Sequence, residues 1–81
     1  MSIYLQALAA DQAGDWDLAH SLIQELSSSS AAWIHAYLHR KEGDRFNAQY
    51  WYHKAGKPYH EGSLEQEWEE IYQYLTEVKK S

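Results

Sequence analysis

Apolar residues recur three and four positions apart along almost the whole chain, and no segment alternates between apolar and polar residues. This spacing is typical of amphipathic α-helices, because residues three and four apart lie on one helical face. The pattern therefore predicts an all-α protein of about five helices. Their expected ranges are 2–13, 16–26, 31–42, 45–55 and 64–79.

Two glycine-aspartate pairs mark the expected joints between helices. Gly14-Asp15 and Gly43-Asp44 each separate two segments of helical periodicity. Glycine ends helices by adopting a left-handed backbone conformation, and the aspartate side chain accepts hydrogen bonds from the free N–H groups that begin the next helix. Each pair therefore predicts a helical hairpin, over residues 2–26 and 31–56.

Serine, glycine and proline mark the remaining boundaries. The serine run 27–30 predicts a linker whose last serine caps the third helix, because serine side chains compete for backbone hydrogen bonds. Gly56 ends the fourth helix, and Pro58 prevents its continuation. Ser63, with Gln66 three residues later, forms a capping-box pattern at the start of the fifth helix.

The two expected hairpins repeat one another. Gly14 and Gly43 are 29 residues apart, and at this offset Ala19 matches Ala48. Both segments, AGDWDLAHSLI and EGDRFNAQYWY, have a small residue four positions before a large one. They resemble the tetratricopeptide repeat, although that repeat has 34 residues and the spacing here is 29. The resemblance implies stacked hairpins over the region before Pro58, with 64–79 as a capping helix. It also implies a scaffold that binds a protein segment or a small ligand.

Composition narrows the classes of function. The chain has 81 residues, which suits a single domain over 1–81, and it contains no cysteine. Its net charge is −5, so we expect no nucleic-acid binding, which requires clustered positive charge. No run of about 18 apolar residues and no signal-peptide pattern is found, so we expect no membrane association and a cytoplasmic location.

The third expected helix carries the most suggestive chemistry. It is apolar nearly all round, which predicts a central, buried position. His35 and His39 lie four residues apart and therefore share one face, as two zinc ligands on a helix do. No glutamate follows the first histidine, so the hydrolytic HExxH pattern is absent. A third ligand would have to come from Glu42, Asp44, His53 or a neighbouring helix. The alternative is that the two histidines are a structural pair, hydrogen-bonded within the helical core, because buried polar groups need partners.

Polar and aromatic side chains that packing does not explain gather in the second hairpin. They define a candidate site for a ligand or partner: His35, His39, Arg40, Tyr50 and His53. Trp51 and Tyr52 are assigned to the core, and Asp15 and Asp44 to helix caps. No nucleophile with a base at a recognisable spacing and no phosphate-binding glycine loop is found, so the sequence predicts no cofactor and disfavours an enzyme.

Three functions therefore remain open. The first is a binding module that uses the second hairpin. The second is a metal-binding protein or metal-dependent enzyme that uses His35 and His39. The third is a subunit of a homodimer, because small domains often gain stability by association.

Overall fold

The computed structural model describes residues 2–77, and it confirms the all-α class with five helices and no strand among those residues. The end of the fifth expected helix, at Val78 and Lys79, lies outside the described residues. The observed helices are α1 (Ile3–Gln12), α2 (Trp16–Ile23), α3 (Ser29–Lys41), α4 (Arg45–Ala55) and α5 (Leu64–Glu77). No helix in this part of the chain combines the length and the apolar character needed to cross a membrane.

The two glycine-aspartate joints have the same geometry. Gly14 and Gly43 both have φ +87°, in the left-handed region where a Cβ atom is strained. The backbone N–H of Asp15 donates to the carbonyl of Ala10, and Asp44 makes the equivalent bond five residues back, each at 2.9 Å. This is the Schellman arrangement, which satisfies carbonyl groups at a helix end. The aspartate side chains then cap α2 and α4, as the sequence predicted.

The serine run was misread from the sequence. α2 ends at Ile23 rather than at residue 26, and α3 begins at Ser29, so two of the four linker serines are helical. Ser28, not Ser30, caps α3, since its hydroxyl accepts from the N–H of Ala31 at 3.1 Å. The Tyr4 hydroxyl lies 2.7 Å from the Ser28 hydroxyl oxygen. This tertiary contact fixes Ser28 as the cap, and local serine chemistry does not reveal it.

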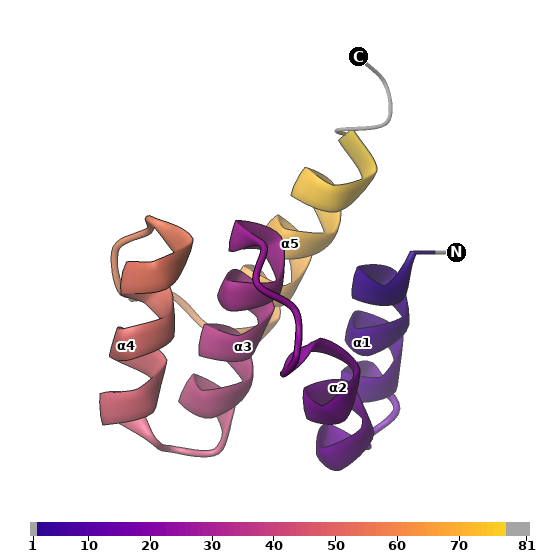
Figure 1. Ribbon diagram of the computed structural model, residues 1–81, viewed down its shortest axis with the longest axis horizontal. Coiled ribbons are helices and arrows are strands. Elements are labelled where there is room, and N and C mark those ends of the chain that lie inside the picture. Colours follow the sequence, from indigo (N-terminus) through magenta and orange to yellow (C-terminus); the bar gives the residue numbers. More distant parts are fainter. Residues whose placement is uncertain (1, 78–81) are drawn as a thin grey trace.

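Helix α3 lies at the centre of the fold, as its uniform apolar character predicted. All eight residues from Ala31 to Leu38 are buried. Figure 1 shows α3 between α4 on one side and α1 with α2 on the other, with α5 passing behind. The helix contacts each of the other four, whereas α4 has close backbone contacts, among the described helices, with α3 alone. Side chains on different faces of α3 therefore belong to different environments.

A buried carboxylate joins α5 to the second hairpin. Glu67 is 0 % exposed, and its Oε1 atom accepts from the guanidinium Nε of Arg40 at 3.0 Å. Its Oε2 atom accepts from the indole N–H of Trp33 at 3.1 Å and from the Tyr52 hydroxyl at 2.5 Å. Burial raises the pKa of Tyr52, and the hydrogen bond to Glu67 raises it further, so the hydroxyl remains a donor. Three donors thus satisfy one charge that would be costly to bury alone.

We expect the substitution Glu67→Ala to lower the free energy of unfolding by about 3–5 kcal/mol, because it leaves the partly buried Arg40 guanidinium without its counter-charge and the Trp33 and Tyr52 donors without an acceptor. Urea unfolding followed by circular dichroism measures this loss. Glu69→Ala, at an exposed position on the same helix, is the matched control and should change stability by about 0.5 kcal/mol or less. Equal effects of the two substitutions would contradict the role given to Glu67.

Candidate metal centre

Three imidazole rings converge where α2 crosses α3. His20 comes from α2, whereas His35 and His39 lie one turn apart on α3. One ring nitrogen from each residue lies within 4.8 Å of those from the other two. The Nε2 atoms of His20 and His35 are 2.9 Å apart, which is hydrogen-bond distance. We call these three residues the histidine triad.

Two tryptophans hold the triad in place. Trp16 precedes His20 by one turn of α2, and the two rings stack with centroids 4.9 Å apart and planes 10° apart. The Trp16 indole N–H donates to the carbonyl of Leu38 at 2.8 Å, which fixes α2 against α3. From the other side Trp51 of α4 stacks on His35, with centroids 3.9 Å apart. The rings therefore have little freedom to rotate away from one another.

The third imidazole is oriented by a carboxylate. The Nδ1 atom of His39 lies 2.6 Å from Oε1 of Glu42, three residues later at the end of α3. A carboxylate only accepts hydrogen bonds, so Nδ1 carries a proton, and in the neutral imidazole Nε2 has the free lone pair. Metal-binding histidines commonly have such a carboxylate partner, which fixes both the tautomer and the orientation of the ring.

The environment keeps the inner imidazoles neutral. Burial, followed by repulsion from His20 and His39, lowers the pKa of His35 to about 4. Burial is also the main cause that lowers the pKa of His20, and His39 adds to it, while Glu42 and Asp17 oppose the change. Neutral imidazole is the form that binds transition metals. His35 is only 5 % exposed, whereas His20 and His39 are both partly exposed, so solvent reaches the triad from the side of those two rings.

A second group of potential ligands is less suitable. His39, Glu42 and Asp44 also have ligand atoms within 4.8 Å of one another. Both carboxylate oxygens of Asp44 are already engaged, since they accept from the backbone and side-chain N–H groups of Asn47 at 3.1 and 2.6 Å. Those hydrogen bonds cap α4, and they lower the pKa of Asp44. The histidine triad is therefore the better candidate.

The structure brings together only part of the site predicted from the sequence. His35 and His39 share the triad, and Tyr50 lies nearby, with its ring at an angle of 87° to that of Trp51. Arg40 is turned elsewhere, because its guanidinium binds Glu67 and the carbonyl oxygens of Gly62 and Ser63. His53 is exposed and belongs to neither group of potential ligands found in residues 2–77.

Sequence reasoning missed His20. The sequence pattern gives that residue no role, although a neighbouring helix is one of the expected sources of the third ligand. One signal was present: Trp16 and His20 are four residues apart, so they share a face beside the buried Ala19 and Ile23. The assignment of Trp51 to the core is correct only in part, because its ring covers the triad and remains partly exposed.

No family model matches this chain, and neither curated proteins nor solved structures give a significant match. The resemblance to the tetratricopeptide repeat therefore stays a prediction. Binding of a protein segment and formation of a homodimer also stay predictions. The exposed aromatic residues of α4, Phe46 and Tyr50, are 84 % and 51 % exposed.

We expect the stability of the metal-free protein to fall as the pH is lowered from about 6.5 to 4. An ordinary histidine titrates near 6.5, so in this window the unfolded chain binds a proton that the buried His35 does not. At about 1.4 kcal/mol per pKa unit, the lowered pKa of His35 corresponds to roughly 3–3.5 kcal/mol of stability, present in full above pH 6.5 and lost toward pH 4.

Urea unfolding at several pH values measures this dependence, and His35→Gln is the control, since glutamine keeps a hydrogen-bonding side chain but does not titrate. The variant should show a flatter dependence of stability on pH between 4 and 6.5. An identical dependence in the two proteins would show that His35 is not the titrating group.

Proposed function

We propose that this protein binds one late first-row divalent metal ion, such as Zn²⁺, through His20, His35 and His39. The observation that carries the proposal is the convergence of three imidazole nitrogens, from two helices, within 4.8 Å. Borderline-soft ions of this class prefer imidazole ligands, and a site built only of histidines disfavours Mg²⁺ and Ca²⁺, which prefer oxygen.

The metal-free geometry is close to what an ion requires. In a tetrahedral zinc site with Zn–N distances near 2.0–2.1 Å, ligand nitrogens are separated by about 3.3 Å. The Nε2 atoms of His20 and His35, now 2.9 Å apart, would separate slightly, and His39 would approach. The proton between the two Nε2 atoms would move to the Nδ1 atom of the ring that carries it, because the ion takes the Nε2 lone pair while the ring stays neutral.

Three protein ligands leave a fourth coordination position for water or a small ligand. Structural zinc sites normally use four protein ligands, whereas sites that act on a substrate keep one position open. Helices α2 and α3 supply the three histidines, and the partial exposure of His39 gives the open position access to solvent. The site is therefore suited to hold a metal ion whose fourth ligand, water or a small molecule, can be exchanged. This makes the predicted binding role more specific, since the small ligand would bind through the ion.

We expect the protein, once freed of metal by a chelator, to bind one Zn²⁺ or Co²⁺ per chain. The variants His20→Ala and His39→Ala should lose this binding. Isothermal titration calorimetry with Zn²⁺ gives the stoichiometry, and the visible absorption of Co²⁺ reports tetrahedral coordination. The matched control is His53→Ala, because His53 is exposed and lies outside the triad. If His53→Ala weakens binding as much as His39→Ala does, or if neither changes it, the proposal is wrong.

We expect Glu42→Gln to weaken metal binding by about 10–100-fold without abolishing it, the effect usual for the carboxylate partner of a ligating histidine. Its carboxylate fixes the His39 ring but is not itself a ligand in the proposed site. The same calorimetric titration measures the change. A complete loss of binding would instead make Glu42 a direct ligand, as in the group His39, Glu42 and Asp44.

A further inference from the structure

A cleft of about 570 Å³ lies between α1, α3 and α5, on a different face of α3 from the histidine triad. Tyr37 and Lys41 line it from α3, each two residues beyond a triad histidine, and two residues turn an α-helix by about 200°. Its volume lies within the usual range for small-molecule sites. Nothing in the proposed metal site accounts for this cleft.

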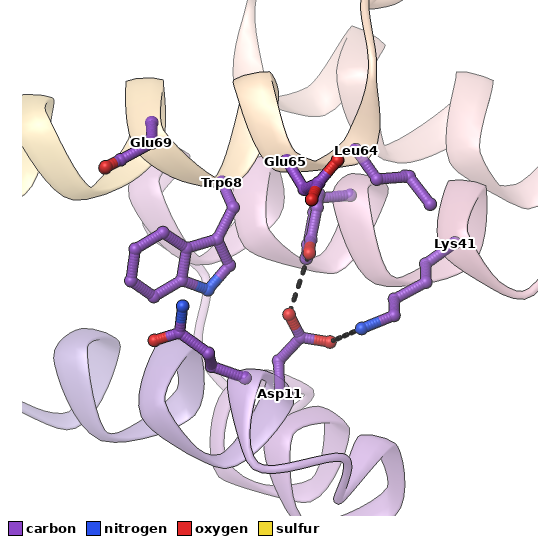
Figure 2. A pocket seen from close by; sticks show the side chains of 8 residues that line it. Asp11, Lys41, Leu64, Glu65, Trp68 and Glu69 are labelled. Atoms are coloured by element: carbon purple, nitrogen blue, oxygen red, sulfur yellow. Dashed lines mark hydrogen bonds and ion pairs between the residues drawn. The ribbon is translucent and has the colours of Figure 1, made fainter.

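One end of the cleft is electrically balanced. The Asp11 carboxylate is only 2 % exposed, and it accepts from the Tyr37 hydroxyl at 2.7 Å and from the Lys41 ammonium at 2.8 Å. Figure 2 shows Lys41 on one side of this carboxylate and the Trp68 indole on the other. The charges of Asp11 and Lys41 therefore offset one another.

An aromatic wall is fixed in place above this end. The Trp68 indole N–H donates to the carbonyl of Leu8 in α1 at 3.1 Å, and its ring stacks on Tyr72 with planes 8° apart. Two constraints from different elements thus hold the indole in the cleft. An indole face attracts cations more strongly than the other aromatic side chains do.

The rim of the cleft has an uncompensated negative charge. Glu65 and Glu69 line it one turn apart on α5, on either side of Trp68 in the sequence. Both are exposed, and neither has a hydrogen bond or ion pair within the described part of the chain. Carboxylates four residues apart on a helix repel each other. A cation placed between them would relieve this repulsion.

We infer that this cleft binds an alkylguanidinium group, as carried by an arginine side chain, with its plane against Trp68 and its N–H groups toward Glu65 and Glu69. A guanidinium combines the two properties that the cleft selects, since it stacks on aromatic rings and donates in-plane hydrogen bonds to carboxylates. An anionic ligand is excluded by the same charges. The inference does not depend on metal binding, because the two sites share no residue.

The test is a titration of the metal-free protein with Nα-acetylarginine-N-methylamide. The NMR signals of the Trp68 indole N–H and of the α5 backbone report binding. The citrulline analogue is the neutral control, because it has the same shape without the charge. We expect saturable shifts with the arginine compound, at least about five-fold weaker binding of the citrulline compound, and weaker binding at high salt. Equal shifts with both compounds, or shifts that do not involve Trp68, would overturn the inference.

Variants locate the site and separate it from the metal centre. Glu65→Gln should weaken binding of the arginine compound by about five-fold, whereas Glu77→Gln, an exposed glutamate of α5 outside the cleft, should leave it unchanged. His39→Ala should bind as the unmodified chain does, so failure of the metal proposal would not affect this result. Titration with ethylguanidinium distinguishes a free guanidinium compound from a peptide arginine as the natural ligand. If ethylguanidinium binds as tightly as the arginine compound, a free guanidinium compound is sufficient. If it binds more weakly, the ligand is a peptide arginine.

Discussion

The fold depends on a carboxylate that is buried without access to water. Glu67 brings a negative charge into the contact between α5 and the second hairpin, and Arg40, Trp33 and Tyr52 surround it with donors. A charge in this position admits few alternatives, because any other placement of α5 would leave it unpaired. Apolar packing alone would permit α5 to slide along α3. The hydrogen bonds to Glu67 therefore determine the register of α5.

That register in turn creates the cleft. With Glu67 directed into the core, the neighbouring Trp68 reaches the carbonyl of Leu8 in α1, and Glu65 and Glu69 are left at the surface. The central position of α3 completes the arrangement, because its faces serve different purposes. One face presents His35 and His39 to α2, and another presents Tyr37 and Lys41 to the cleft. A single buried helix thus positions side chains for two separate sites.

The helix class and most helix ends were predictable, because they follow from local chemistry. The joints at Gly14 and Gly43 were identified from residue type alone, and their backbone angles agree. The start of α3 was not predictable, because four adjacent serines offer four equivalent caps and a contact from Tyr4 selects among them. Burial of Glu67 was readable, since it lies three residues after Leu64 and four before Ile71, on the apolar stripe of α5.

The candidate metal centre was predictable only by half. The spacing of His35 and His39 identifies one face of one helix, but the third nitrogen depends on the angle and position at which α2 crosses α3. No periodicity in the sequence specifies that crossing. Arg40 illustrates the opposite error, since neighbours in sequence on a helix point in different directions. Proximity along the chain therefore led to the inclusion of Arg40, which lies outside the site, and to the omission of the third imidazole, which lies within it.

The contact between indole and imidazole rings gives the protein an optical property. Two of its four tryptophans, Trp16 and Trp51, stack directly on histidines of the triad. Because these rings are in contact, protonation of either histidine would place a positive charge directly against an indole face. The intrinsic fluorescence of the unlabelled chain is therefore sensitive to the state of the triad, so events at this site can be followed without any attached probe.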